Sequence, residues 1–245
     1  MARRARFGLR QLRITRGALV VAGLELGFSL VAMLCDYDTR ATIFQYTLAT
    51  ADNVFGKGRV WTLATSAFFQ PDLLGLALNL FVLWSFVPTL ERFWGTRRFY
   101  RFVAITSVAG TLAGTLMGLA TGRVDVPIAG LSPFICASIV AFGIVYGRQP
   151  VQFFGVLPLS GRQLMWGFIG FYALFVLLQG LWEQGAALAA ASIAAAVMTS
   201  KRWSPGLAWR RWRIARARAR LSVLEGGMRE PRPKPPKRPD ERFIN

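Results

Sequence analysis

The chain has 245 residues, of which 53% are hydrophobic and only 17% are charged. This apolar content is too high for one water-soluble domain of that length, so the composition excludes an ordinary soluble enzyme and indicates a membrane protein. The 30 Lys and Arg against 12 Asp and Glu give a net charge of +18. In a membrane protein such a charge is typical of topology and of attraction to anionic lipid, and we expect no nucleic-acid partner.

Six apolar stretches are each about 20 residues long, enough to cross a hydrocarbon core of roughly 30 Å as a helix. We place them at 17–35, 73–90, 99–120, 129–147, 164–182 and 184–200, with only Glu183 between the last two. The sequence therefore predicts an all-α membrane domain over residues 17–200, built as a bundle of six transmembrane helices.

Basic residues are concentrated in alternate connections. Residues 1–16, the connections near 91–101 and 148–162, and the chain after residue 200 hold most of the 30 Lys and Arg. Because basic residues stay on the cytoplasmic side, this pattern predicts that both termini are cytoplasmic. The first apolar run lacks an A-x-A cleavage site, so we expect it to remain as a span. The preference for Arg over Lys favours a bacterial inner membrane.

The chain after residue 200 divides into two parts. Residues 201–225 combine Trp209 and Trp212 with many arginines, which predicts a basic helix lying on the anionic cytoplasmic leaflet. Residues 226–245 contain P-R-P-K-P-P-K-R-P, a composition typical of an extended, disordered tail.

The connection from Asp36 to Gln70 is much longer than the others and mixes aromatic with polar residues. Such a mixture is typical of a segment in the membrane interface. Two spans also carry small residues at every fourth position, which allows close helix packing in lipid. These residues are Gly110, Gly114 and Gly118 in the third span and Ala187, Ala191 and Ala195 in the sixth.

Glu25 falls near the midpoint of the first span. An ionised carboxylate there costs about 2.5 kcal/mol or more, so we expect Glu25 to face the bundle. It is either a proton or client site or an interhelical hydrogen-bond partner. The second interpretation is favoured because the predicted spans offer no other ionisable residue as a relay partner. Cys35 and Cys136 fit no disulfide or metal spacing, and no cofactor site is predicted.

Three segments carry a family resemblance. They are V-W-T-L-A-T-S-A-F-F-Q-P-D-L-L-G-L-A-L-N-L-F-V-L-W from Val60, E-R-F-W-G-T-R-R-F from Glu91, which includes Gly95, and G-L-S-P from Gly130. Together they resemble the rhomboid superfamily of intramembrane serine endopeptidases, over roughly residues 17–200. The resemblance implies a six-helix bundle with a long, partly embedded first loop.

The resemblance also implies a site at the outer face of the bundle. Ser132 takes the place of the catalytic serine, and Asn79 takes that of a second-span oxyanion donor. Gly75 and Gln70 stand where the family has histidines near that span, and Gln184 stands where the family has its sixth-span histidine base.

The chain contains no histidine. A serine hydroxyl is a weak nucleophile until an adjacent base takes its proton, and the carboxamide of Gln184 cannot do so. Lys57 lies in the first loop, and Glu183 is expected at the water boundary, on another helix face from Gln184. The replacement of the family's glycine by Pro133 is a further departure.

Each site residue also has a structural interpretation. Ser132 followed by Pro133 is typical of a helix start, with Ser as the N-cap and Pro in the first turn. Asn79 is equally suited to hydrogen bonding between helices.

The sequence thus favours a catalytically inactive pseudoprotease that binds transmembrane client segments. One alternative is an active rhomboid-type endopeptidase with Ser132 as nucleophile. A second is a small transporter or channel, disfavoured because no inverted repeat is visible. By the resemblance, the client surface lies beside the fifth span, and its candidate residues are Trp166, Phe168, Phe171, Tyr172 and Phe175.

Overall fold

The computed structural model describes residues 14–148, 150–153, 157–200, 213, 214 and 216. The chain forms two units, residues 1–201 and residues 202–245. The predicted basic helix at 201–225 and the tail at 226–245 lie almost entirely outside the described residues, and Arg213, Ile214 and Arg216 are helical.

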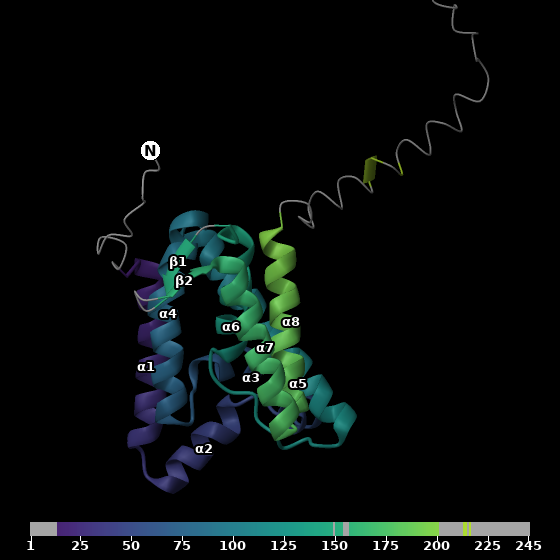
Figure 1. Ribbon diagram of the computed structural model, residues 1–245. Helices are drawn as coiled ribbons and strands as arrows, with labels where there is room; N and C mark the ends of the chain where they lie inside the picture. Colours follow the sequence, from purple (N-terminus) through teal and green to yellow (C-terminus); the bar gives the residue numbers. More distant parts are fainter. Residues whose placement is uncertain (1–13, 149, 154–156, 201–212, 215, 217–245) are drawn as a thin grey trace, which may run out of the picture. The chain divides into compact units, whose positions relative to one another are not determined.

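Six long helices form the first unit, one in each of the apolar stretches (Figure 1). They are α1 (Arg16–Leu34), α4 (Leu73–Trp94), α5 (Thr96–Thr121), α6 (Ser132–Val145), α7 (Gly161–Gln179) and α8 (Trp182–Thr199). Four of them, α1, α4, α5 and α7, are long and apolar enough to cross a membrane. The protein is therefore an integral membrane protein with several apolar helices.

The two remaining long helices show where the predicted spans were inexact. Helix α6 has only 14 residues against the 19 expected, so it extends about 21 Å. Helix α8 begins at Trp182, and Glu183 lies inside its first turn instead of separating two spans. The turn before α8 is made by Gly180 and Leu181, and Gly180 adopts the left-handed conformation (φ 63°).

Helix α6 lies at the centre of the bundle. Every residue from Pro133 to Gly143 is buried, and the helix contacts α4, α5, α7 and α8. A helix that is apolar on all sides is typical of a fully buried position. The central position of α6 puts Ser132, its first residue, at the edge of the core. A short antiparallel hairpin, β1 (Pro150–Phe153) and β2 (Leu157–Ser160), connects α6 to α7.

The seam between α5 and α8 confirms the predicted packing of small residues. A Cβ added at Gly110 would lie 3.0 Å from the Ala187 carbonyl oxygen, and one at Gly114 would lie 3.0 Å from that of Glu183. Ala187, Ala191 and Ala195 are completely buried. The two backbones therefore approach too closely for larger side chains.

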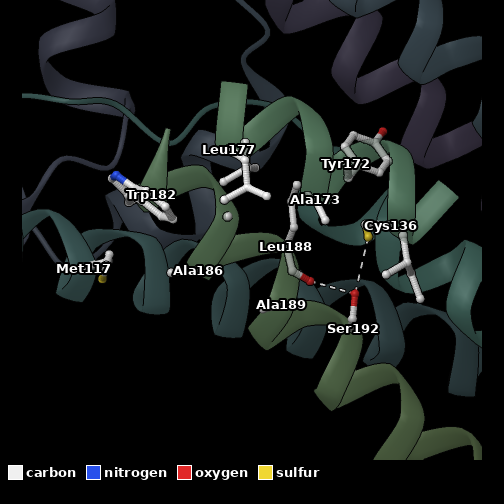
Figure 2. A pocket seen from close by; sticks show the side chains of 13 residues that line it. Met117, Cys136, Tyr172, Ala173, Leu177, Trp182, Ala186, Leu188, Ala189 and Ser192 are labelled. Atoms are coloured by element: carbon white, nitrogen blue, oxygen red, sulfur yellow. Dashed lines mark hydrogen bonds between the residues drawn. The ribbon is translucent and has the colours of Figure 1, made fainter. Parts of the chain in front are cut away.

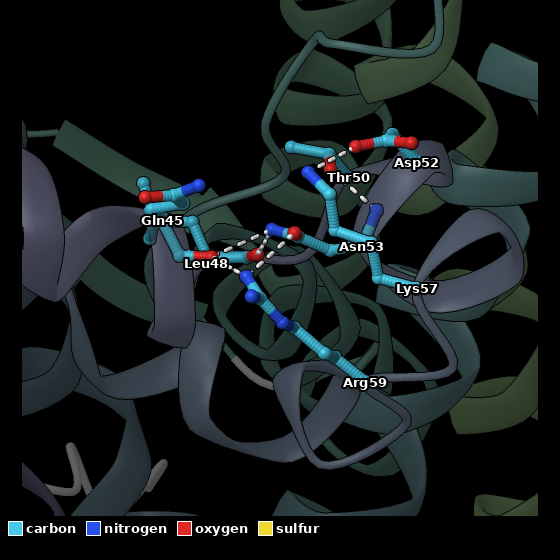
Figure 3. Close-up of polar contacts among 7 residues, drawn as sticks. All are labelled: Gln45, Leu48, Thr50, Asp52, Asn53, Lys57 and Arg59. Carbon is cyan, nitrogen blue, oxygen red and sulfur yellow. Dashed lines mark hydrogen bonds and ion pairs between the residues drawn. The ribbon is translucent and has the colours of Figure 1, made fainter.

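The first connection is folded into short helical segments. These are α2 (Tyr37–Thr47), a π-helical turn (Asp52–Gly56), α3 (Thr62–Thr65) and a 3-10 turn (Ser66–Phe68). Figure 3 shows how side chains connect the end of α2, the π-helical turn and Arg59. The Asn53 amide donates to the carbonyl oxygens of Gln45 and Leu48, both at 3.0 Å. Arg59 donates to the Gln45 carbonyl at 3.1 Å and to the Asn53 side chain at 3.3 Å.

Backbone hydrogen bonds then join this connection to the segment before α6. Ile128 donates to the Ala49 carbonyl at 2.8 Å, and Asp52 donates to the Val124 carbonyl at 3.1 Å. The two connections therefore close one end of the bundle together. Tyr46 and Trp61 remain exposed there, as an interfacial segment requires.

Candidate functional site

A buried polar cluster lies between α1, α4 and the segment before α6. Its centre is Glu25, which is fully buried and accepts a hydrogen bond from the Asn79 amide at 2.8 Å. The same amide lies 3.5 Å from the Gln70 side-chain oxygen. The second carboxylate oxygen of Glu25 has no hydrogen bond within the described residues. Glu25 and Asn79 thus form the hydrogen bond between helices that the structural interpretation expects.

Gln70 connects the cluster to the start of α4. Its backbone N–H donates to the Ser29 hydroxyl at 2.9 Å, and its amide donates to Asp72 at 2.6 Å. Asp72 is the N-cap of α4 and accepts from the Gly75 backbone N–H. A Cβ at Gly75 would lie 2.3 Å from the Gln70 amide nitrogen. The histidine that the family has at this position therefore does not fit without displacing Gln70.

Gly130 closes the cluster from the side of α6. Its φ is +73°, a conformation that favours glycine, and an added Cβ would lie 1.9 Å from the Gln70 side-chain oxygen. Its backbone N–H donates to the Ser66 carbonyl at 2.9 Å. The glycine of G-L-S-P is therefore favoured by its backbone conformation, while the contact with Gln70 involves a flexible side chain that can shift.

Ser132 lies two residues further on and is partly exposed. The expected N-cap role is wrong by one residue, because Leu131 occupies the N-cap position and Ser132 is the first helical residue. Pro133 is buried against the α5 seam, where a Cβ at Gly110 would lie 2.5 Å from its own. No hydrogen bond joins Ser132 to Asn79 within the part of the chain that the structure describes.

Gln184 lies in the first turn of α8 and is partly buried. Its neighbour Glu183, expected at the water boundary, is covered by the protein itself, with a side chain that is 1% exposed. Glu183 accepts from the Thr121 hydroxyl at 3.0 Å and pairs with Arg123 at 3.3 Å. Glu183 is thus occupied on the α5 side of the bundle, and no hydrogen bond joins it or Gln184 to Ser132 among the described residues.

These placements decide what the cluster can do chemically. Proton transfer from a serine hydroxyl needs a base within hydrogen-bonding distance, about 2.6–3.2 Å. The carboxylate of Glu25 instead holds Asn79, and that of Glu183 holds Thr121 and Arg123. The arrangement is one of structural hydrogen bonds between helices, in which Asn79 is already committed to a partner.

The segment E-R-F-W-G carries a third buried carboxylate, Glu91, whose role the sequence did not explain. Glu91 accepts hydrogen bonds from the backbone of Gly17 at 3.0 Å and of Ala18 at 2.8 Å, and from the hydroxyls of Thr15 and Thr96. It thereby caps the N-terminus of α1 and ties it to the turn between α4 and α5. Gly95 makes that turn with φ 78° and ψ 153°, a region that only glycine adopts readily.

The pair of Glu25 and Asn79 gives the first testable prediction. Asn79→Ala removes the donor that Glu25 needs, and we expect it to lower the free energy of unfolding by about 1 kcal/mol. Glu25→Gln keeps an acceptor oxygen and is expected to cost less. In a double-mutant cycle with Glu25→Ala, thermal unfolding of the purified protein should give a coupling of about 0.6–1.7 kcal/mol. Strictly additive effects would show that the bond contributes nothing.

A known protein family matches this helical unit. A family model described as eukaryotic integral membrane protein (DUF1751) matches residues 18–200, which is most of the chain and nearly the whole helical unit. The chain belongs to this family. No curated protein matches it.

The family description agrees with the apolar helices of an integral membrane protein, and it specifies no activity or site. Integral membrane proteins of this eukaryotic family are described without an activity, so the rhomboid resemblance stays an interpretation of the residues. The expected bacterial inner membrane has no support, because the family is described as eukaryotic.

Proposed function

We propose that the protein is a rhomboid-like six-span membrane protein that binds transmembrane segments of client proteins and hydrolyses no peptide bond. The observation that carries the proposal is the absence of histidine from a chain whose motifs resemble those of a histidine-dependent protease. In this proposal both termini face the cytoplasm and the buried polar cluster faces the outer half of the membrane.

The side-chain contacts of the site support the loss of chemistry. Oxyanion stabilisation requires donors that point at the position of the developing charge. The Asn79 amide donates instead to Glu25, and Gly75 supplies no side chain. Among the described residues Ser132 therefore lacks both a base and a free donor, so restoring one residue does not restore the site. Gln184→His alone is expected to remain inactive, and the accompanying Gly75→His would also have to displace the Gln70 side chain.

The exposure of α7 supports a client surface there. Only 22% of the apolar 18-residue stretch of α7 is buried. The corresponding values for α1, α4 and α5, the other three helices long enough to cross a membrane, are 33%, 39% and 50%. Its aromatic residues divide into two sets. Trp166, Phe171 and Phe175 are exposed, whereas Phe168 packs on the core and Tyr172 lines a groove. The exposed set forms the client surface in this proposal.

The test of the missing chemistry is a labelling experiment, which is the second prediction. Purified protein treated with a serine-directed fluorophosphonate is expected to show no labelling above that of Ser132→Ala, because Ser132 has no base to activate it. A model transmembrane substrate should remain intact in the same preparation. Labelling or cleavage that disappears in Ser132→Ala would make the protein an active serine endopeptidase.

A further inference from the structure

A second feature of the bundle is an apolar groove between α5, α6, α7 and α8 (Figure 2). Its volume is about 520 Å³, within the range of ligand sites in proteins. Its walls come mostly from α7 and α8, with Tyr172 and Leu177 on one and Leu188 and Ala189 on the other. The buried polar cluster around Glu25 contributes none of the lining.

Two of the polar side chains that line the groove, Cys136 and Ser192, already have partners. The Cys136 thiol lies 3.3 Å from the Ser192 hydroxyl, and that hydroxyl donates to the Leu188 carbonyl at 2.7 Å, as Figure 2 shows. A ligand therefore finds no unsatisfied donor or acceptor at these atoms. Apart from the Tyr172 hydroxyl and the Trp182 indole N–H, the rest of the lining is apolar, so the groove suits an apolar chain.

The length of the groove matches one leaflet of a membrane. Along α8 it extends from Trp182 to Ser192, about ten residues of roughly 1.5 Å rise each, or about 15 Å. Half of a hydrocarbon core of roughly 30 Å is the same length. An acyl chain of one leaflet thus fits the groove from end to end.

The groove has a polar mouth at the end marked by Trp182. The indole is 46% exposed there, and Trp at a helix end is typical of the head-group level. Arg123 lies at the same turn, where it donates to the Gly180 carbonyl at 3.0 Å and pairs with Glu183 at 3.3 Å, and its side chain is 46% exposed, which leaves part of the guanidinium open to a phosphate. A half-exposed guanidinium is suited to a lipid phosphate.

The volume of the groove excludes a whole transmembrane helix. A helix about 10 Å wide and 30 Å long fills on the order of 2,000 Å³, several times the 520 Å³ present. We propose that this groove is a binding site for a phospholipid, with one acyl chain between α7 and α8 and the phosphate near Arg123. The lining includes none of the exposed aromatic residues Trp166, Phe171 and Phe175, and the proposal does not depend on client binding.

The test uses a phospholipid that carries a photoreactive diazirine in its acyl chain. The full-length protein is purified in detergent, given a small excess of this lipid and irradiated, and the adducts are mapped by mass spectrometry. We expect adducts to concentrate on the groove-lining residues of α7 and α8, such as Tyr172, Val176 and Ala186, and not on Phe171 or Phe175. Ala189→Phe fills the groove and should reduce them by about tenfold or more. Ile193→Phe is the matched control, since Ile193 is on α8, exposed and outside the groove, and should leave them unchanged.

Two results would overturn the proposal. The first is labelling of the wild-type protein that is spread evenly over all exposed apolar faces, which indicates loosely associated lipid. The wild-type experiment alone gives this result, so it needs no variant. The second is a photocrosslinker at Ala189 that yields protein adducts in native membranes, which would make the groove a protein-binding site.

Discussion

Glu91→Ala is expected to lower the free energy of unfolding by about 3 kcal/mol, which corresponds to a fall in Tm of roughly 6–12 °C. The carboxylate accepts from two backbone N–H groups of α1 and two hydroxyls, and it is almost completely buried. Hydrogen bonds to charged groups contribute more than neutral ones, and their loss strands buried donors. Thermal unfolding of the purified protein in detergent measures the change.

The control for Glu91 is an exposed neighbour. Arg97 lies on the surface in the first turn of α5. Arg97→Ala is expected to change the free energy of unfolding by no more than about 0.5 kcal/mol. Glu91→Gln keeps one acceptor oxygen and removes the charge. Its Tm should therefore lie between those of Glu91→Ala and Arg97→Ala. If the Tm of Glu91→Ala equals that of Arg97→Ala, the cap on α1 does not hold the bundle together.

Gly110→Ala is the second substitution that is expected to lower the free energy of unfolding strongly. The added methyl group would lie 2.5 Å from the Pro133 Cβ and 3.0 Å from the Ala187 carbonyl oxygen, and neither atom belongs to a flexible side chain. Overpacking of this kind costs about 1–3 kcal/mol. Gly170→Ala is the matched control, because an added Cβ there meets nothing within 4 Å. That control is expected to be neutral or stabilising by up to about 1 kcal/mol, through helix propensity.

Thermal unfolding of the two glycine variants in the same detergent measures this difference. Equal melting temperatures would mean that α5 and α8 do not pack as closely as the structure shows. A larger loss in Gly170→Ala would point instead to a tight contact at α7.

The helices could be predicted from the sequence because membrane spans are long, apolar and interrupted by polar connections. The predicted span at α6 was too long, since Gly130 and Leu131 are apolar in composition but lie in the buried turn against Gln70. The burial of Glu183 could not be predicted from the sequence. A charged residue at a predicted helix end is expected at the surface, whereas Thr121 and Arg123 satisfy this carboxylate inside the bundle.

The polar contacts of the site could not be predicted from the sequence. Asn79 lies 54 residues from Glu25 and 9 residues from Gln70 along the chain, and no periodicity brings such positions together. The same is true of Glu91, whose partners in α1 and just before it are 73 to 76 residues away. The family motif drew attention to Glu91 and Gly95, but their physical role followed only from the contacts.

Photocrosslinking from α7 in native membranes tests the central claim most directly, namely that the protein holds client helices without cutting them. A photoreactive residue at Phe171, which is 63% exposed, is expected to give discrete adducts with intact membrane proteins. The matched position is Val31 on α1, which is 60% exposed and is expected to give lipid adducts alone. Lipid adducts alone at both positions, or partners at Phe171 that are cut within their transmembrane segment, would contradict the account.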